Sequence, residues 1–388
     1  MTATLFPFKP ILPYKQKLEW LTDVMMSYGG QEQRVRVRHA PRSKFSTRII
    51  TSQGSVAARI RAFLAKYQGD LIGFPAWHDA TAIAAGIGSG VSSITLDTTE
   101  CEFYEGANAV IWEDDATCEF LEIATVSAGG ITLSSPTTQA YGSGVLVMPM
   151  HEAYFGERIE HDDLTGDIST FLLEIQCVNE NLLTEDHWSS QVYLGSRVMD
   201  DPILLSSSSV VPRAISRPMT FVDYGMGAVE LFDKTGFSFF HSDDYKWVLN
   251  TRSDIWKFRQ WLSYMAGQMN TVWIPSFTKD VVLTGAFLSA DVGLFISPYG
   301  YVVDEAFTHL AFIKSDGSIL CREASNWSAN TVTIDSGLGF DGTMSDFDRI
   351  SFLRLYRFMT DSIELEWEPQ DRLMTSIPIK TVYEEESA

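Results

Sequence analysis

The chain carries the same kind of segment twice, once in each half. Ser55–Gly69 reads SVAARIRAFLAKYQG, and Ser253–Gly267 reads SDIWKFRQWLSYMAG. Each segment begins with a serine, which is favoured at helix N-caps, and ends at a glycine, which is favoured just after a helix. Apolar residues recur at helical spacing on one face of each segment: Val56, Ile60, Phe63, Leu64 and Tyr67, and Ile255, Phe258, Trp261, Leu262 and Met265. The sequence therefore predicts one amphipathic helix of about four turns in each half.

Three further pairs of similar segments follow these helices in the same order. They are Gly73–Trp77 with Trp273–Phe277, Gly130–Ser135 with Thr331–Ser336, and Ile168–Val178 with Arg372–Val382. Strand–helix–strand patterns recur in many unrelated proteins, so each match alone carries little weight. Four matches in one order favour an internal duplication.

Outside the two helices the sequence has the patterns of β-strands. Ser362–Glu368 alternates polar and apolar residues, which predicts a half-buried strand. Arg34–Arg38 alternates likewise, and we expect Val35 and Val37 to face the core. Short β-branched runs broken by glycine and aspartate fill Thr95–Met150, which indicates a small β-module.

These patterns predict a fold that is mainly β with a few helices (α+β). We expect two tandem duplicated β-sandwich domains, each with one principal helix and an inserted small β-module. The first domain spans residues 1–182, with its module at about 84–150. The second spans residues 183–388, with its module at about 283–355.

Net charge and composition restrict the function. The 388 residues carry a formal net charge of −21. Such an acidic surface repels nucleic acid and anionic lipid, which disfavours a DNA reader and suits a DNA conduit. The four cysteines contain no CxxC pair, as is typical of proteins that fold in a reducing cytoplasm. Met1–Leu12 lacks the apolar region of a signal peptide, and no run of eighteen apolar residues predicts a membrane span.

No motif in the sequence predicts catalysis. Gly337–Gly342 spells GxGxxG, but another predicted strand follows it instead of a helix, so a hairpin loop explains it better than a dinucleotide site. His161–Asp163 and His241–Asp244 have the composition of turns and lack the spacing of metal ligands. We therefore predict no catalytic, cofactor-binding or metal-binding residues and a protein that is not an enzyme. A hydrolase with paired carboxylates is an alternative that one sequence leaves open.

A basic cluster stands against the acidic background. It comprises Arg48 and the five residues Arg34, Arg36, Arg38, Arg42 and Lys44. One interpretation is a solvated strand face. The other is a hairpin that docks on an acidic face of a neighbouring subunit, where complementary charge sets the register. Arg34, Arg36, Arg38, Arg42 and Lys44 are the candidate subunit-interface residues.

The segment Leu18–Arg42 (LEWLTDVMMSYGGQEQRVRVRHAPR) resembles the start of tail structural proteins of tailed bacteriophages. The similarity rests on Trp20–Asp23, Gly30–Arg34 and Pro41-Arg42. A degenerate version near Val222–Leu231 in the second half lacks the Glu-Gln-Arg element.

The resemblance implies tail-tube-like β-sandwiches that assemble as rings around the DNA channel. A distal tail or hub protein and a non-contractile tail sleeve both have this character, and neither is an enzyme. The expected partners are further copies of the chain, as a trimer or hexamer, and other tail proteins, without cofactors, sequence-specific nucleic acid or membrane insertion. The expected location is the virion tail, assembled in the cytoplasm of the bacterial host.

An alternative function is a receptor- or carbohydrate-binding tail component. Trp112 and Trp327 lie in the two predicted β-modules, and exposed indole rings stack on sugars. Core packing is the simpler interpretation of both residues.

Overall fold

The computed structural model describes residues 3–26, 32–164, 168–178, 183, 191–199, 213–217, 219–225, 227, 229–233, 238–297, 308–368 and 372–382. Within these ranges the protein is mainly β, with two α-helices and a large, predominantly antiparallel sheet. Neither helix is long and apolar enough to cross a membrane. The predicted boundary at residue 182 and residues 27–31 of the resemblance lie outside the described residues.

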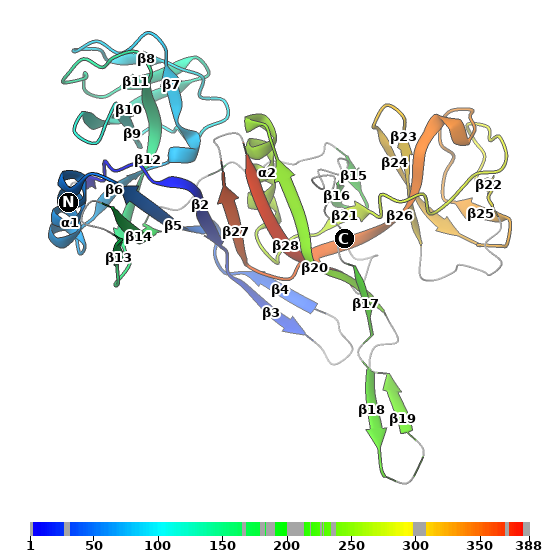
Figure 1. The fold of residues 1–388 in the computed structure, drawn as a ribbon. Coiled ribbons are helices and arrows are strands. Elements are labelled where there is room, and N and C mark those ends of the chain that lie inside the picture. Colours follow the sequence, from blue (N-terminus) through cyan, green and yellow to red (C-terminus); the bar gives the residue numbers. More distant parts are fainter. Residues whose placement is uncertain are drawn as a thin grey trace.

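Eight strands from both halves of the chain form the central sheet (Figure 1). Every neighbouring pair among them is antiparallel. In spatial order they are β13 (Glu160–Asp163), β14 (Ser169–Cys177), β5 (Arg42–Thr51), β2 (Ile11–Glu19), β27 (Ser362–Trp367), β28 (Leu373–Thr381), β20 (Phe239–Leu249) and β17 (Ala214–Ser216). The first four strands belong to the first half, residues 3–178, and the last four to the second half, residues 183–382.

Helices α1 (Gly54–Tyr67) and α2 (Arg252–Met265) confirm the two predicted helices. The predicted serine N-caps are wrong, because Gln53 and Thr251 hold those positions. The Thr251 hydroxyl accepts a hydrogen bond from the backbone N–H of Asp254 at 3.1 Å, which satisfies one free donor of the first turn.

Both helices bury their predicted apolar faces in one core that the two halves share. Ile60 and Leu64 of α1 and Phe258 and Trp261 of α2 belong to it. Trp247 of β20 lies against Trp261, with ring centroids 5.9 Å apart. Large aromatic side chains therefore join helix and sheet, as expected for a β-rich chain with 12% aromatic residues.

A second group of strands in the first half continues from the central sheet. The members are β1 (Thr4–Leu5), β6 (Ile72–Pro75), β7 (Thr81–Ile83), β8 (Ser93–Thr95), β9 (Asn108–Trp112), β10 (Cys118–Ser127), β11 (Gly130–Leu133) and β12 (Val145–Phe155), with the 3₁₀ turn η1 (Trp77–Asp79). They pair in the order β6–β12–β9–β10–β11–β8. A hydrophobic cluster within residues 83–147 fills this part of the fold.

The corresponding strands of the second half pair in the same way. They are β15 (Val192–Tyr193), β16 (Ser196–Val198), β21 (Val272–Pro275), β22 (Gly293–Phe295), β23 (His309–Lys314), β24 (Ile319–Ser325), β25 (Thr331–Ile334) and β26 (Phe347–Phe358), with the 3₁₀ turn η2 (Met344–Asp346). Their order is β21–β26–β23–β24–β25–β22. A hydrophobic cluster within residues 281–350 fills this part.

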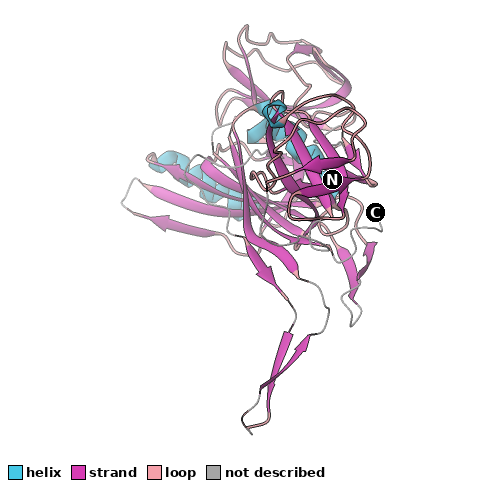
Figure 2. Cartoon of the chain, turned by 90° about the vertical axis from the view of Figure 1, so that its right-hand side faces the viewer, coloured by secondary structure: helices cyan, strands magenta, loops and turns pink. Residues whose placement is uncertain are grey.

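Two hairpins project beyond the central sheet. The first, β3 (Thr22–Met26) with β4 (Glu32–Arg36), connects β2 to β5 in the sequence. The second, β18 (Met219–Asp223) with β19 (Val229–Asp233), connects β17 to β20. Figure 2 shows that β18–β19 extends well away from the body of the molecule. We call this second hairpin the arm.

Candidate subunit interface and a buried ionic cluster

The two halves meet edge to edge where β2 pairs with β27. Leu18 lies opposite Ile363, and both side chains are almost fully buried. On the other face of the sheet Lys17 lies opposite Glu364, and Lys15 Nζ reaches the Glu364 carboxylate at 2.6 Å. The edge of the first half is thus basic where the edge of the second half is acidic. Such cross-strand pairs fix the register of two strands.

Side chains of the second half also enter the core of the first half at this joint. The Trp367 ring stacks on His78 with centroids 4.3 Å apart, and its indole N–H donates to Gln16 Oε1 at 3.1 Å. The Nδ1 atom of His78 lies 2.8 Å from the Tyr14 hydroxyl. All four side chains are buried, so their polar atoms are satisfied by one another.

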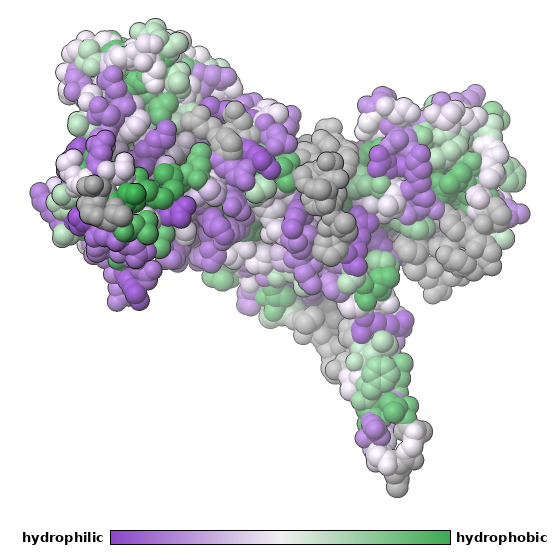
Figure 3. Space-filling view, in the orientation of Figure 1, coloured by the Kyte–Doolittle hydropathy of each residue, from purple (hydrophilic) through white to green (hydrophobic). Residues whose placement is uncertain are grey.

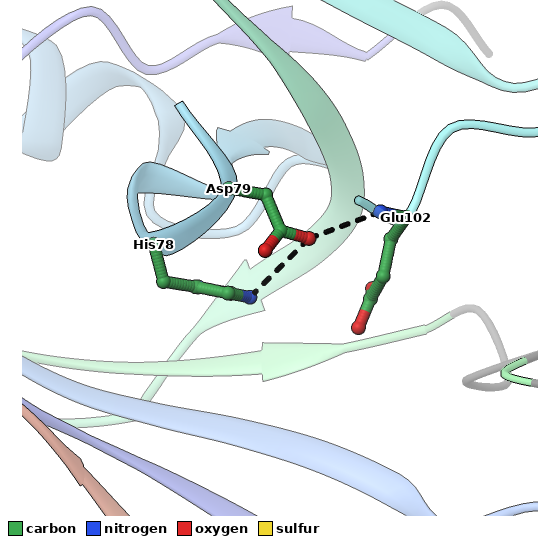
Figure 4. A group of neighbouring side chains, drawn as sticks. All are labelled: His78, Asp79 and Glu102. Atoms are coloured by element: carbon green, nitrogen blue, oxygen red, sulfur yellow. Dashed lines mark hydrogen bonds and ion pairs between the residues drawn. The ribbon is translucent and has the colours of Figure 1, made fainter. Parts of the chain in front are cut away.

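Arg259 of α2 completes the joint as the centre of an ionic cluster. Its guanidinium lies 3.2 Å from Asp79 Oδ1 and forms an ion pair with the Glu102 carboxylate. Figure 4 shows Asp79 beside His78 in η1, with Glu102 approaching from the segment between β8 and β9. The backbone N–H of Glu102 donates to Asp79 Oδ2 at 3.0 Å. Three charged side chains are therefore buried together, and two halves of the chain contribute them.

Burial and the neighbouring charges set the protonation of this cluster. Burial lowers the pKa of His78 to about 3 and that of His151 to about 4, so both imidazoles are neutral at physiological pH. Burial by itself would raise the pKa of Asp79. The charge and the hydrogen bonds of Arg259, together with the neighbouring His78 and Arg252, outweigh this effect and hold the pKa below its ordinary value.

The potential ligand atoms of His78, Asp79 and Glu102 lie within 4.8 Å of one another, as in many metal sites. Arg259, however, bonds both carboxylates and lies 3.5 Å from His78 Nε2. The guanidinium occupies the position between the carboxylates where a metal cation would bind, so these residues do not fit a metal. The arrangement links residues from both halves of the chain, and its side chains are almost fully buried.

The predicted interface residues on the first hairpin have partners within the chain. Arg34 is buried, forms an ion pair with Glu32, and donates from Nη1 to the carbonyl of Gln268 at 2.9 Å. Lys380 Nζ approaches the same Glu32 carboxylate at 2.7 Å. Arg34 therefore fastens the hairpin to the second half of its own chain.

The remaining basic residues also lie against their own chain. Arg36 donates to the backbone carbonyl of His39, and Arg38 donates to the carbonyl of Glu19 at 2.6 Å. Lys44 Nζ lies 2.7 Å from Glu174, and Arg42 stands opposite Glu19 in the β2–β5 pair. A role of these five residues in subunit docking stays a prediction.

The predicted orientation of the first hairpin is wrong. Val35 and Val37 face solvent, with 46% and 54% of their surface exposed, and the arginines face inward. The alternation correctly separated the valines from the arginines onto two faces of the strand. The arginine face, however, is the inner one, where it meets ionic partners. Glu32, two residues before Arg34 on the same face, is the signal that points to it.

The two acidic histidine segments lie in strands, so the predicted turns are also wrong. His161–Asp163 belongs to β13, and His241–Asp244 belongs to β20 with a register irregularity between Ser242 and Tyr245. The glycine-rich Gly337–Gly342 segment, in contrast, lies between strands β25 and β26 as predicted, and the short 3₁₀ turn η2 before β26 was not predicted.

The two candidate glycan-stacking tryptophans pack against the protein. Trp112 donates its indole N–H to the carbonyl of Pro7 at 2.7 Å and meets Trp77 edge to face. Trp327 is 7% exposed and belongs to the cluster within residues 281–350, near Phe352. Trp327 is almost fully buried and Trp112 is half-buried, and a role of either ring in sugar binding stays a prediction.

The arm is an exposed apolar feature that the sequence did not predict. Every residue of β19 is exposed, and so are four of the five residues of β18. More than half of the surface is exposed for Phe221, Tyr224, Val229, Leu231 and Phe232. Figure 3 shows apolar side chains following one another along this projection.

Comparison with known proteins adds no assignment. No protein-family model matches the chain, and no curated protein matches it significantly.

Proposed function

We propose that this chain is a non-enzymatic structural protein of a bacteriophage tail, and that it works as a homo-oligomeric ring or sleeve near the DNA channel. Two tandem copies of a tail-tube-like β-sandwich, each with a helix and an inserted β-module, make up the chain. The matching strand pairings of the two halves support this duplication, as do the matching sequence segments. The similarity of Leu18–Arg42 to tail proteins and the net charge of −21 support the location.

The observation that carries the proposal is the arm. An isolated two-stranded hairpin is at best marginally stable in water. This one exposes Phe221, Leu231 and Phe232 to solvent, with no core beneath them among the described residues. Contiguous apolar surface on a projection is a hallmark of a protein–protein contact. A chain that carries such an arm is a component of an assembly.

A ring explains why one chain carries both an arm and two similar halves. Closed rings require head-to-tail contacts, in which one surface of a subunit meets a different surface of the next. Duplicated halves let a trimer present domains in approximate sixfold order, and a hexamer in twelvefold order.

Electron microscopy of the purified protein beside intact virions tests the proposal. We expect a closed ring or a stack of rings, and the same density in the tail. A matched variant, Phe221→Ser with Leu231→Ser, keeps the body of the protein and should reduce the assembly. Monodisperse monomers at micromolar concentration, without a counterpart in the virion, would overturn the proposal.

A further inference from the structure

The central sheet ends in two strands that carry free edges. β13 pairs with β14 and β17 pairs with β20, and no other strand of the described residues pairs with either. An unpaired edge offers a row of backbone donors and acceptors to another strand. These two edges belong to different halves and lie at opposite ends of the same sheet (Figure 1).

The strand order shows that each of the two edge strands is equivalent to one strand of the β2–β27 joint. The first half runs β13–β14–β5–β2, and the second runs β27–β28–β20–β17. The joint pairs β2, the last strand of the first half, with β27, the first strand of the second. Free β17 thus corresponds to β2, and free β13 corresponds to β27.

We propose that β17 of one copy pairs antiparallel with β13 of the next copy, in the register of the β2–β27 joint. This inference rests on the proposed ring, for which it supplies the contact. The partner is a second copy of this chain because the chain already contains the same contact between its own halves.

Two pairings within the halves define the register. The last residue of β2, Glu19, pairs with the first residue of β5, and the last residue of β17, Ser216, pairs with the first residue of β20. Ser216 therefore corresponds to Glu19, and Ile215 to Leu18. By the same comparison, the last residues of β13 and β27 pair with the first residues of β14 and β28.

The corresponding residues on the acidic side are also matched in sequence. Residues 158–163 read RIEHDD and residues 362–367 read SIELEW, so Ile159 corresponds to Ile363. Leu18 faces Ile363 in the joint. Ile215 of one copy therefore faces Ile159 of the next, and Ser216 faces Arg158.

Burial and charge at the free edges agree with this pairing. Ile215 is 66% exposed, whereas its counterpart Leu18 is 2% exposed, so the contact would cover an apolar side chain. β13 carries Glu160, Asp162 and Asp163, as β27 carries Glu364 and Glu366. Arg213, which precedes β17, corresponds in this register to Gln16 of β2 and would face His161 of the next copy.

A pocket beside β17 supplies the second observation. It has a volume of about 390 Å³ and is lined by Ile215, Phe240, Tyr245, Ile274, Phe352 and Tyr356, among others. The hydroxyls of Ser242 and Tyr245 are buried at this pocket and have no hydrogen-bond partner among the described residues. Unpartnered buried hydroxyls are costly, and a polar group arriving from outside would satisfy them.

The first half shows how the region equivalent to this pocket is filled. The strands that line the pocket, β17, β20, β21 and β26, correspond to β2, β5, β6 and β12. There the Trp367 ring from the neighbouring half covers His78 and bonds Gln16 of β2. The residue of β13 that corresponds to Trp367 is Asp163. Its Oδ1 already accepts from Arg61 and Ser169 within its own chain, and the second carboxylate oxygen can accept from Tyr245 or Ser242 of the next copy.

Cross-linking tests the register directly. The variant Arg158→Cys with Ser216→Cys places two thiols on directly opposite residues, within reach of a disulfide. Mild oxidation should give a ladder of covalent multimers, with the largest band equal to the subunit number seen by microscopy. The control Asp162→Cys with Ser216→Cys is out of register by roughly 13 Å and should give less than about a tenth of that product. Oxidised wild type, with its native cysteines, sets the background.

A second variant separates this contact from the ring itself. Ile215→Lys should lower the assembled fraction in sedimentation velocity more than tenfold, whereas Ile50→Lys, at an exposed isoleucine of central strand β5, should leave it unchanged. Rings that persist with Ile215→Lys, or that cross-link equally in both registers, would overturn this contact and leave the proposed ring standing. Monomers without rings in the wild type would overturn both.

Discussion

Replacing Arg259 with methionine tests whether the buried ionic cluster holds the halves together. Arg259 is 1% exposed, and its guanidinium neutralises both Asp79 and Glu102. Arg259→Met keeps most of the side-chain volume but leaves two buried carboxylates without a cation. Removing one partner of a buried ion pair costs about 3–5 kcal/mol, mostly because the remaining charge stays desolvated. We expect the free energy of unfolding to fall by about this amount.

Chemical denaturation measures the loss, and hydrogen exchange locates it. The Arg259→Met change should accelerate the exchange of β2 and β27 amides, relative to the wild type, more than that of β23 and β24 amides. The reason is that the cluster lies at the joint. The compensated variant Arg259→Met with Asp79→Asn and Glu102→Gln removes every charge and should recover most of the stability. If Arg259→Met unfolds at the same denaturant concentration as the wild type, the cluster does not stabilise the joint and the reasoning is wrong.

Two further predictions follow from the same interactions. Stability should fall between pH 7 and pH 5 by roughly 2 kcal/mol for each of His78 and His151, because the unfolded imidazoles bind protons below their ordinary pKa of 6.5 while the buried ones, with pKa values of about 3 and 4, do not. A melting temperature that is constant over this range would contradict the neutral assignment. Arg34→Ala should destabilise the first hairpin by about 1–3 kcal/mol, since it removes a buried ion pair with Glu32, whereas the exposed change Val35→Thr should cost less than about 0.5 kcal/mol. Hydrogen exchange of the β3–β4 amides distinguishes the two, and equal protection in both variants would refute an inward-facing arginine.

Local periodicity was sufficient for both helices and for one strand of the central sheet. Helices at Gly54–Tyr67 and Arg252–Met265 and the strand at Ser362–Trp367 lie where alternation and helical spacing predicted them. In that strand Ile363, Leu365 and Trp367 are buried, as predicted. Each of these predictions depends only on residues within one element, which is why one sequence carries them.

Periodicity could not predict which face of a strand is buried where the buried partners are charged. Val35 and Val37 were expected inside, but Glu32 and Lys380 make the opposite face the better partner for Arg34. The same limit hid Arg259, which lies between Ile255 and Leu262 on the apolar face of α2. An arginine in an otherwise apolar helix face is a signal for a buried acidic partner, but the partners, Asp79 and Glu102, lie in the other half of the chain.

The joint is the feature that local sequence is least able to predict, since Lys15 and Glu364 are 349 residues apart. It also determines what the two ends of the sheet can do. Pairing β13 with another copy of itself would set Glu160, Asp162 and Asp163 against the same carboxylates, which like-charge repulsion disfavours. Pairing it with β17 sets Ile215 against Ile159 instead, and β17 carries no carboxylate. The acidic character that β13 shares with β27 therefore disfavours head-to-head addition between chains and leaves head-to-tail addition, which is the geometry that closes a ring.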